Sequence, residues 1–249
     1  ETINSTQTKT ALMQLFYSQD LTANDTLFSF TKQESRHIGK VLRKQIGDTL
    51  HLTNGKGALF TGTLQSNDPK HCVVKITQVE QKTQLPYGLH LAISPTKLND
   101  RFEWFLEKAT EIGITQITPI LCNHSERKII KPERYQKIIL SAAKQSLKYH
   151  FPVLHPISSF NDFLEKHAEL PHRKLIAHCQ EIEKKSLKSQ IKPKGEYIVL
   201  VGPEGDFSDT EITKATSMGY TGVSLGTNRL RTETAAIVVC HSFCYTNEL

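Results

Sequence analysis

The positions of hydrophobic and polar residues give the first part of the chain β character. Leu50 and Leu52 alternate with polar residues, and the following Asn54-Gly55 pair is typical of a tight hairpin turn. Two further short strands, separated by an Asn-Asp-Pro turn signal, are expected at residues 58–64 and 72–79. This pattern predicts a small β-barrel-like domain over residues 13–84.

In the second part, apolar runs of strand length alternate with stretches of helical period. The clearest helix has its apolar residues on one stripe and ends at Gly113: Phe102, Phe105, Leu106, Ala109 and Ile112. Further helices are predicted at residues 132–149, 160–168, 209–218 and 233–247. Strands are predicted at residues 89–93, 114–121, 174–177, 197–201 and 222–225. Strands alternating with helices indicate an α/β domain with a largely parallel sheet over residues 85–249.

The ends of the chain and its composition suit a cytoplasmic protein. Residues 1–12 are polar and rich in threonine, so they are expected to be an extension that precedes the structured part. A hydrophobic content of 38% can support a core. No apolar run approaches the roughly 20 residues that a membrane-spanning helix needs, and no membrane partner is expected.

The cysteines predict neither a disulfide framework nor a zinc site. There are five of them, an odd number, and no two form a CxxC pair. Cys240 and Cys244 would share a helix face near His241, but no further ligand is evident. Packing as small hydrophobic residues is the preferred interpretation, and no metal is expected.

The net charge of +6 permits a polyanionic partner, and its distribution is more informative than its total. Seven basic residues between Cys122 and His150 are opposed by only Glu126 and Glu133: Arg127, Lys128, Lys131, Arg134, Lys137, Lys144 and Lys148. This stretch is either a solvated helix face or a surface for RNA phosphates. A second basic cluster lies in the first domain: Arg36, Lys40, Arg43, Lys44 and, in the hairpin turn, Lys56.

Two segments near the C-terminus are candidates for chemistry because each follows a predicted strand. The first, Gly202-Pro203-Glu204-Gly205, is followed by Ser208 and Glu211, which form a capping-box signature. Ligands of open α/β sheets bind at the carboxyl ends of strands, although a tight structural turn would explain the segment equally well. The second, residues 225–236, carries two arginines and Glu233 in a loop where Thr232 is a plausible helix cap.

The common nucleotide and hydrolase motifs are absent. The sequence contains no GxxxxGK[ST], no GxGxxG after a strand, no GxSxG and no HExxH. A P-loop, a Rossmann dinucleotide site, a nucleophile elbow and a zinc protease site are therefore not indicated.

These segments resemble those of the bacterial 16S rRNA uridine-N3 methyltransferase family, which belongs to the trefoil-knot (SPOUT) methyltransferases. The resemblance covers nearly everything after Met13 and is most specific at Gly202–Gly205 and at Leu225-Gly226 with Leu230–Ala235. It implies a knotted α/β domain that binds S-adenosylmethionine, a PUA-like RNA-binding barrel before it, and a homodimer acting on 16S rRNA, within the small ribosomal subunit. Supporting matches are Lys108–Gly113 and Ala142–Ser146.

The resemblance also implies site residues. Cofactor contacts would come from Leu200, Gly202, Glu204, Gly205, Leu225, Gly226, Leu230, Thr234 and Ala235. Arg231 would stabilise negative charge on the target uracil, and Glu233 would orient Arg231 or receive the proton indirectly. A carboxylate that only favours the start of its helix is the alternative for Glu233.

The sequence departs from the family pattern at three places. After Gln145-Ser146 the family usually has an arginine, and here Lys148, Tyr149 and His150 follow. Asp206 stands where a second glycine is expected, and Asn228-Arg229 stands where an arginine precedes an aliphatic residue. Two other functions therefore stay open: a related knotted enzyme acting on another rRNA or tRNA nucleoside, and an RNA-binding assembly factor without catalytic activity.

Overall fold

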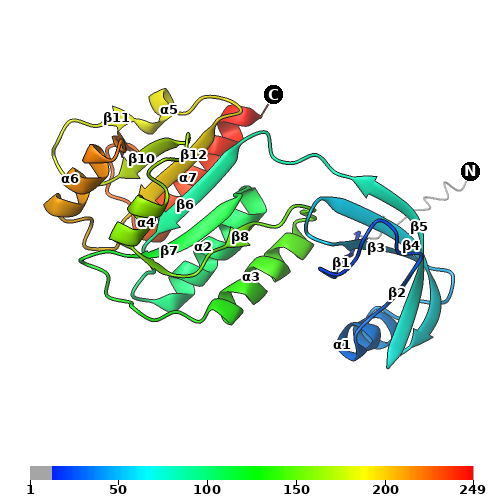
Figure 1. Ribbon diagram of the computed structural model, residues 1–249. Coiled ribbons are helices and arrows are strands. Elements are labelled where there is room, and N and C mark those ends of the chain that lie inside the picture. The colour runs from blue at the N-terminus through cyan, green and yellow to red at the C-terminus, as the bar shows by residue number, and fades with distance from the viewer. Residues whose placement is uncertain (1–12, 249) are drawn as a thin grey trace, which may run out of the picture. The chain divides into compact units, whose positions relative to one another are not determined.

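The computed structural model describes residues 13–248, so the predicted extension at residues 1–12 lies outside the described residues (Figure 1). The chain forms two compact units. The first ends at Thr83 and also contains Leu147–His150, and the second comprises Gln84–Ser146 and the chain from Phe151 onward.

The first unit is built on a five-stranded sheet with the order β1-β3-β4-β5-β2. Its strands are β1 (Leu15–Tyr17), β2 (Leu27–Ser29), β3 (Thr49–Thr53), β4 (Ala58–Asp68) and β5 (His71–Gln81), and a short helix, α1 (Lys32–Arg36), continues into a π-helical turn over His37–Val41. The core includes Phe16, Ile38, Leu52 and Phe60, all nearly inaccessible to solvent.

The predicted hairpin is confirmed, but the strands after it are longer than predicted. Strands β3 and β4 pair antiparallel, and the Asn54 side chain accepts a hydrogen bond from the backbone N–H of Lys56 at 2.9 Å. Asn67 and Asp68, predicted to lie in a turn, belong to β4. Two irregularities in register let the pairing of β4 with β5 continue, and Asp68 closes the short turn by accepting from the Lys70 N–H.

The second unit contains an eight-stranded sheet in which every pairing is parallel. Seven strands follow the order β11-β13-β10-β12-β6-β7-β8, and β9 pairs with β7. Their bounds are β6 (Gly88–Ile93), β7 (Gln116–Leu121), β8 (Val153–Leu154), β9 (Ser158–Ser159), β10 (Arg173–Ala177), β11 (Lys185–Ser186), β12 (Glu196–Val201) and β13 (Thr221–Ser224). The predicted parallel α/β architecture is confirmed.

Helices cover both faces of this sheet (Figure 1). One face packs against α2 (Asn99–Ile112), α3 (Pro132–Gln145), α5 (Leu187–Gln190) and α7 (Thr232–Asn247), and the other against α4 (Phe160–Lys166) and α6 (Asp209–Ser217). Side chains of strand β12 point alternately to the two faces. Val199 packs in the core on the α2 and α7 side, while Ile198 and Leu200 pack in the core on the α4 and α6 side. Burial on both faces explains the continuous apolar run of this strand.

Two predicted helix ends are wrong for local reasons. Helix α3 ends at Gln145 and not at residue 149, because Leu147 has a φ of 54°, which cannot continue a right-handed helix. Thr232, predicted to cap the last helix, is its first helical residue, and Arg231 occupies the cap position. The predicted end of α2 at Gly113 is confirmed; its φ of 137° suits only glycine.

Within residues 13–248, no group of three or more His, Cys, Asp or Glu side chains is arranged to hold a metal ion. Cys240 is buried in the core beside Phe243, whereas Cys244 is partly exposed. No helix in the described part of the chain is long and apolar enough to cross a membrane.

A group of histidine rings lies in the core on the α4 side of the sheet. His90 on β6 is buried, and its ring centroid lies 5.1 Å from those of both His155 and His167. Its Nε2 is 2.7 Å from the Thr118 hydroxyl. Burial, and then the neighbouring imidazoles, lower the pKa of His90 to about 3. The pKa values of His155 and His167 are also lowered, mainly by burial.

The thermal stability of the second unit is therefore expected to fall as the pH drops below the ordinary histidine pKa of 6.5. In that range the unfolded chain binds protons that the folded chain does not. The free energy of unfolding therefore falls by roughly 1.4 kcal/mol per pH unit for each histidine that stays neutral in the folded state. For His90 this loss continues down to a pH of about 3. Melting temperatures of the wild type and of His90→Leu, measured between about pH 7.5 and pH 5, check this. The variant is expected to show a shallower decline, and an unchanged slope would contradict the assignment.

Candidate functional site

A pocket of about 800 Å³ opens at the carboxyl ends of three adjacent strands, β10, β12 and β13. Three chain segments line it: the end of β10 with the following loop, the turn after β12, and the loop that joins β13 to α7. The lining residues are Ala177–Gln180, Lys184, Val201–Glu204, Asp206, Val223–Thr232 and Ala235. This is the edge at which open parallel sheets bind ligands.

The turn after β12 brings backbone and one carboxylate close to the pocket. A Cβ atom on Gly202 would lie 3.0 Å from the buried Phe207 ring, a tight contact that the ring could accept only by shifting by a few tenths of an ångström. Glu204 Oε1 accepts a hydrogen bond from the Lys97 N–H at 2.9 Å. Its Oε2 is buried and has no hydrogen-bond partner among the described residues, which leaves it available to a ligand.

The predicted capping box that ends this turn is confirmed. Ser208 caps α6 and accepts from the Glu211 N–H, while the Glu211 carboxylate accepts from the Ser208 N–H. The cap fixes the point at which the turn becomes a helix.

The loop before α7 is tied directly to this turn. The Thr232 hydroxyl is buried and donates to the Gly202 carbonyl oxygen at 3.1 Å. Gly226 has a φ of 128°, and a Cβ there would meet open space, so its backbone faces the pocket without crowding. Arg229 and Arg231 are exposed and line the pocket. The predicted basic loop is therefore part of the site.

Glu233 lies behind the pocket and does not line it. Its side chain is only 8% exposed, and Oε1 is 3.9 Å from Arg101 Nε on α2. Its second oxygen is buried and unpaired within the described part of the chain. The residue is in the first turn of α7, where a negative charge also interacts favourably with the helix dipole.

The other predicted cofactor residues fall into two groups. Those that line the pocket are Gly202, Glu204, Leu225, Gly226, Leu230 and Ala235. Leu200 is fully buried in the core, Gly205 is exposed with its Cβ position 3.0 Å from the His124 side chain, and Thr234 is partly exposed on α7. The cofactor contacts of all nine remain predictions.

Sequence reasoning missed the loop after β10. His178, Cys179, Gln180 and Lys184 line the pocket, although only the strand before them was predicted. Burial lowers the pKa of His178, and the charge of Lys184 lowers it further. A signal was available, because residues just after a predicted parallel strand are candidates for a site.

In the basic stretch after Cys122, the two arginines already bind groups of this protein and are therefore less available to RNA phosphates than the sequence indicates. Arg127 donates to the backbone carbonyls of Thr96 and Lys97, and Arg134 pairs with Glu103. Lys144 lies in the last turn of α3, but Lys148 follows the end of the helix and belongs to the first unit. The two lysines therefore do not lie on one continuous helix.

The predicted RNA-binding cations of the first unit lie outside the strands of its sheet, on α1, the π-helical turn and the loops. Arg36 ends α1, and Lys40 is in the π-helical turn that follows. Arg43 has a φ of 53°, and Lys56 is exposed in the hairpin turn. Their contact with RNA remains a prediction.

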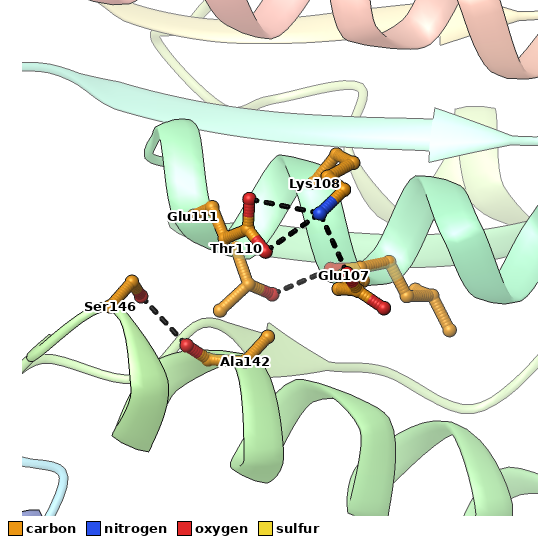
Figure 2. Close-up of polar contacts among 7 residues, drawn as sticks. Glu107, Lys108, Thr110, Glu111, Ala142 and Ser146 are labelled. Carbon is orange, nitrogen blue, oxygen red and sulfur yellow. Dashed lines mark hydrogen bonds and ion pairs between the residues drawn. The ribbon is translucent and has the colours of Figure 1, made fainter.

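The two supporting matches lie at the ends of α2 and α3, and the side-chain contacts drawn in Figure 2 are within these helices. Figure 2 shows the Lys108 ammonium between the carboxylates of Glu107 and Glu111. Its Nζ lies 2.7 Å from Glu107 Oε1 and 3.0 Å from Glu111 Oε1. The Thr110 hydroxyl donates to the Leu106 carbonyl, and the Ser146 hydroxyl donates to the Ala142 carbonyl (Figure 2). None of these side chains lines the pocket.

Two family models match the chain. One, described as an RNA methyltransferase domain, matches residues 83–243, and the other, described as an RNA methyltransferase PUA domain, matches residues 30–77. Among curated relatives, the chain is 31% identical to ribosomal RNA small subunit methyltransferase E of Synechocystis sp., over 84% of this chain and 70% of the relative. Its identity to the protein of the same name from Bacillus subtilis is 30%, over 89% and 91% of the two chains.

Solved structures similar to this chain are also described as methyltransferases. A probable rRNA methyltransferase from Porphyromonas gingivalis is 38% identical, with a TM-score of 0.84 and coverage of 94% of this chain and 100% of that one. A putative methyltransferase from Legionella pneumophila, solved with bound S-adenosylmethionine, is 28% identical, with a TM-score of 0.82 and coverage of 94% and 98%. The fold is that of the trefoil-knot (SPOUT) methyltransferases with an N-terminal PUA-like domain. The chain therefore belongs to the family of RNA methyltransferases that includes ribosomal RNA small subunit methyltransferase E.

Proposed function

We propose that this protein transfers a methyl group from S-adenosylmethionine to N3 of a uridine in 16S rRNA. The observation that carries the proposal is the pocket at the ends of β10, β12 and β13, lined by the Gly202–Glu204 turn and by the loop that presents Arg231. The matches to RNA methyltransferases over both units support it.

The pocket suits S-adenosylmethionine in size and in chemistry. Its volume of about 800 Å³ is within the ordinary range for small-ligand sites. The unpaired Glu204 oxygen can accept a hydrogen bond from a hydroxyl or ammonium group, and the glycines at positions 202 and 226 allow close approach of the backbone. When bound, this cofactor supplies a methyl group already activated by a sulfonium.

The residues of the chain would then orient the uracil and stabilise its charge. The N3–H of uridine is a weakly acidic imide, so negative charge develops on the ring as the proton leaves. Arg231 is exposed at the pocket, where its guanidinium can stabilise that charge. Glu233 is buried beside Arg101, and we assign it the role of holding the first turn of α7 in place.

The first unit would bring the RNA to the pocket. Arg36, Lys40, Arg43, Lys44 and Lys56 supply positive charge, which binds phosphates and sets register without reading sequence. RNA is recognised mainly by shape and exposed bases, so the folded rRNA of a small ribosomal subunit is the proposed substrate.

The test uses small ribosomal subunits from a bacterial strain that lacks N3-methylated uridine in its 16S rRNA. The subunits are incubated with the protein and radiolabelled S-adenosylmethionine, and the digested RNA is analysed for the labelled nucleoside. We expect label in 3-methyluridine. Label in another nucleoside would replace the proposed specificity, and no label in subunits, naked rRNA or tRNA would favour an RNA-binding protein without catalytic activity.

We also propose that the protein acts as a homodimer through α7. This helix also carries apolar side chains on a face that is not fully covered by the core. Val238 on this face is only partly buried, and Tyr245, seven residues further along the same face, is 70% exposed. A second copy packing on this face would cover Val238 and Tyr245, on the helix whose first turn borders the pocket.

Replacing Tyr245 by aspartate is therefore expected to shift the protein from dimer to monomer, because it places a charge in an apolar interface. Sedimentation velocity at micromolar concentration measures the change. Leu170→Asp is the matched control, since Leu170 is 40% exposed and follows α4 on the opposite face of the sheet. Equal dimer fractions for Tyr245→Asp and the wild type would rule out this interface.

A further inference from the structure

The loop after β10 and the turn after β12 are joined by polar contacts at the edge of the pocket. The Cys179 N–H donates to Asp206 Oδ2 at 2.8 Å. The Gln180 side-chain amide donates to Asp209 Oδ1 at 2.7 Å and to the Phe207 carbonyl at 3.3 Å. The two segments thus form neighbouring walls of one pocket whose spacing is set by hydrogen bonds.

Asp206 is the centre of this connection. Its other carboxylate oxygen, Oδ1, accepts from the Phe207 N–H at 2.8 Å, so each oxygen binds one backbone N–H. The backbone of Asp206 has a φ of 62°, and its own N–H donates to the Pro203 carbonyl at 2.9 Å. The left-handed conformation explains why glycine is expected here, and aspartate is among the few other residues that tolerate it.

The loop held by Asp206 has few other restraints at its tip. Residues 181–183 are exposed, and the Lys184 ammonium donates back to the carbonyls of His178 and Gln180, which closes the loop on itself. Ala177 before the loop and Leu187 after it belong to the hydrophobic core, and no residue between them does. His178 at the start of the loop is buried beside Gly222, so it is the exposed part after it whose position depends on the contacts with the turn.

We propose that Asp206 is a positioning residue for the cofactor: its carboxylate fixes the loop of residues 178–184 as one wall of the pocket. A glycine at this position would tolerate the backbone conformation but would remove the bond to the Cys179 N–H, so that the two walls would be joined only by the contacts of Gln180. The inference rests on the proposed function, because it concerns the affinity for S-adenosylmethionine.

Two substitutions separate this role from backbone strain. Asp206→Gly and Asp206→Ala both remove the carboxylate, but only alanine keeps a side chain in the left-handed conformation. The Kd for S-adenosylmethionine is expected to rise by roughly tenfold in both variants, since a loosened wall must be ordered on binding. The melting temperature is expected to be lower for the alanine variant than for the glycine variant.

The experiment measures the Kd by calorimetry and, without ligand, the hydrogen exchange of residues 178–184 by mass spectrometry. Exchange in this loop is expected to be faster in both variants, and kcat at saturating cofactor is expected to change far less than KM. Asp206→Asn keeps one acceptor oxygen and should give an intermediate Kd. Asp68→Ala, which removes a comparable bond to the Lys70 N–H in the first unit, serves as the control.

An unchanged Kd in Asp206→Gly and Asp206→Ala, with a wild type that binds the cofactor, would overturn the assignment and leave the proposed function standing. Unchanged hydrogen exchange in residues 178–184 would overturn it as well. A wild type that does not bind S-adenosylmethionine would instead overturn the proposed function itself, and the assignment with it.

Discussion

Replacing Arg231 by alanine is expected to lower kcat for methyl transfer by about 100- to 1000-fold while the Kd for S-adenosylmethionine changes less than about threefold. Arg231 lines the pocket and is exposed, so its guanidinium is available to a substrate. Loss of a charge that acts only on the developing imide anion reduces kcat and kcat/KM together, because ground-state binding does not depend on it.

The local structure argues against a purely structural role for Arg231. It occupies the N-cap of α7, where its guanidinium cannot cap the helix because it has no acceptor atom for the backbone N–H groups. A cation at this end of a helix is opposed by the helix dipole, so the residue does not stabilise α7 through its charge. Positions that break a local rule in this way are expected at functional sites.

The measurement is single-turnover methylation of small ribosomal subunits, together with calorimetric titration of the cofactor. Arg173→Ala is the matched control: it removes the same charge from the same unit, but Arg173 is exposed at the start of β10, the end opposite the pocket. Arg231→Lys keeps the charge without the planar fork and should retain part of the activity. A kcat for Arg231→Ala within about threefold of the wild type would exclude the proposed role.

Replacing Phe243 by alanine is expected to destabilise the second unit by about 3–5 kcal/mol, which lowers its melting temperature by roughly 10 °C. Phe243 lies on α7, is completely buried, and packs against Tyr197 on β12 with ring centroids 4.7 Å apart. Its ring also lies 6.0 Å from Tyr87. Alanine would leave a cavity among rings that the sheet holds in place.

Thermal unfolding followed by circular dichroism measures this effect. Ile129→Ala is the control, because it also removes a large apolar side chain from the second unit, but Ile129 is 82% exposed and its loss is expected to cost less than about 0.5 kcal/mol. Equal melting temperatures for the two variants would mean that α7 is not packed on β12 as the structure has it.

The regular elements of the second unit could be predicted because their signals are local. Apolar stripes at helical spacing marked α2, and uninterrupted apolar runs marked strands such as β12, buried on both faces. The capping box at Ser208 needs only four residues, and it formed as predicted. The Gly202–Glu204 turn and the Leu225–Arg231 loop were also predicted as site segments, because each follows a strand.

Details of the helix ends and of the charges were not predictable from spacing. Residues 132–149 have helical periodicity throughout, but Leu147 adopts a positive φ and α3 stops before it. From the sequence, Arg127 and Glu233 are expected to be charges exposed to solvent. In the structure, Arg127 is bound by backbone carbonyl oxygens and Glu233 is buried. Both outcomes depend on which segments meet after the chain has folded.

The sequence by itself determined the α/β class, the order of the longer helices and strands of the second unit, and two of the three segments that line the pocket, because periodicity and turn chemistry act over a few residues. It did not show the short elements β8, β9, β11 and α5. Only the tertiary structure decided that the loop of residues 178–184 is the third segment of the pocket. Strand β10 lies between β13 and β12 in the sheet, so the carboxyl ends of these three strands converge. That neighbourhood is set by parallel pairings between residues far apart in the chain, which no local pattern specifies.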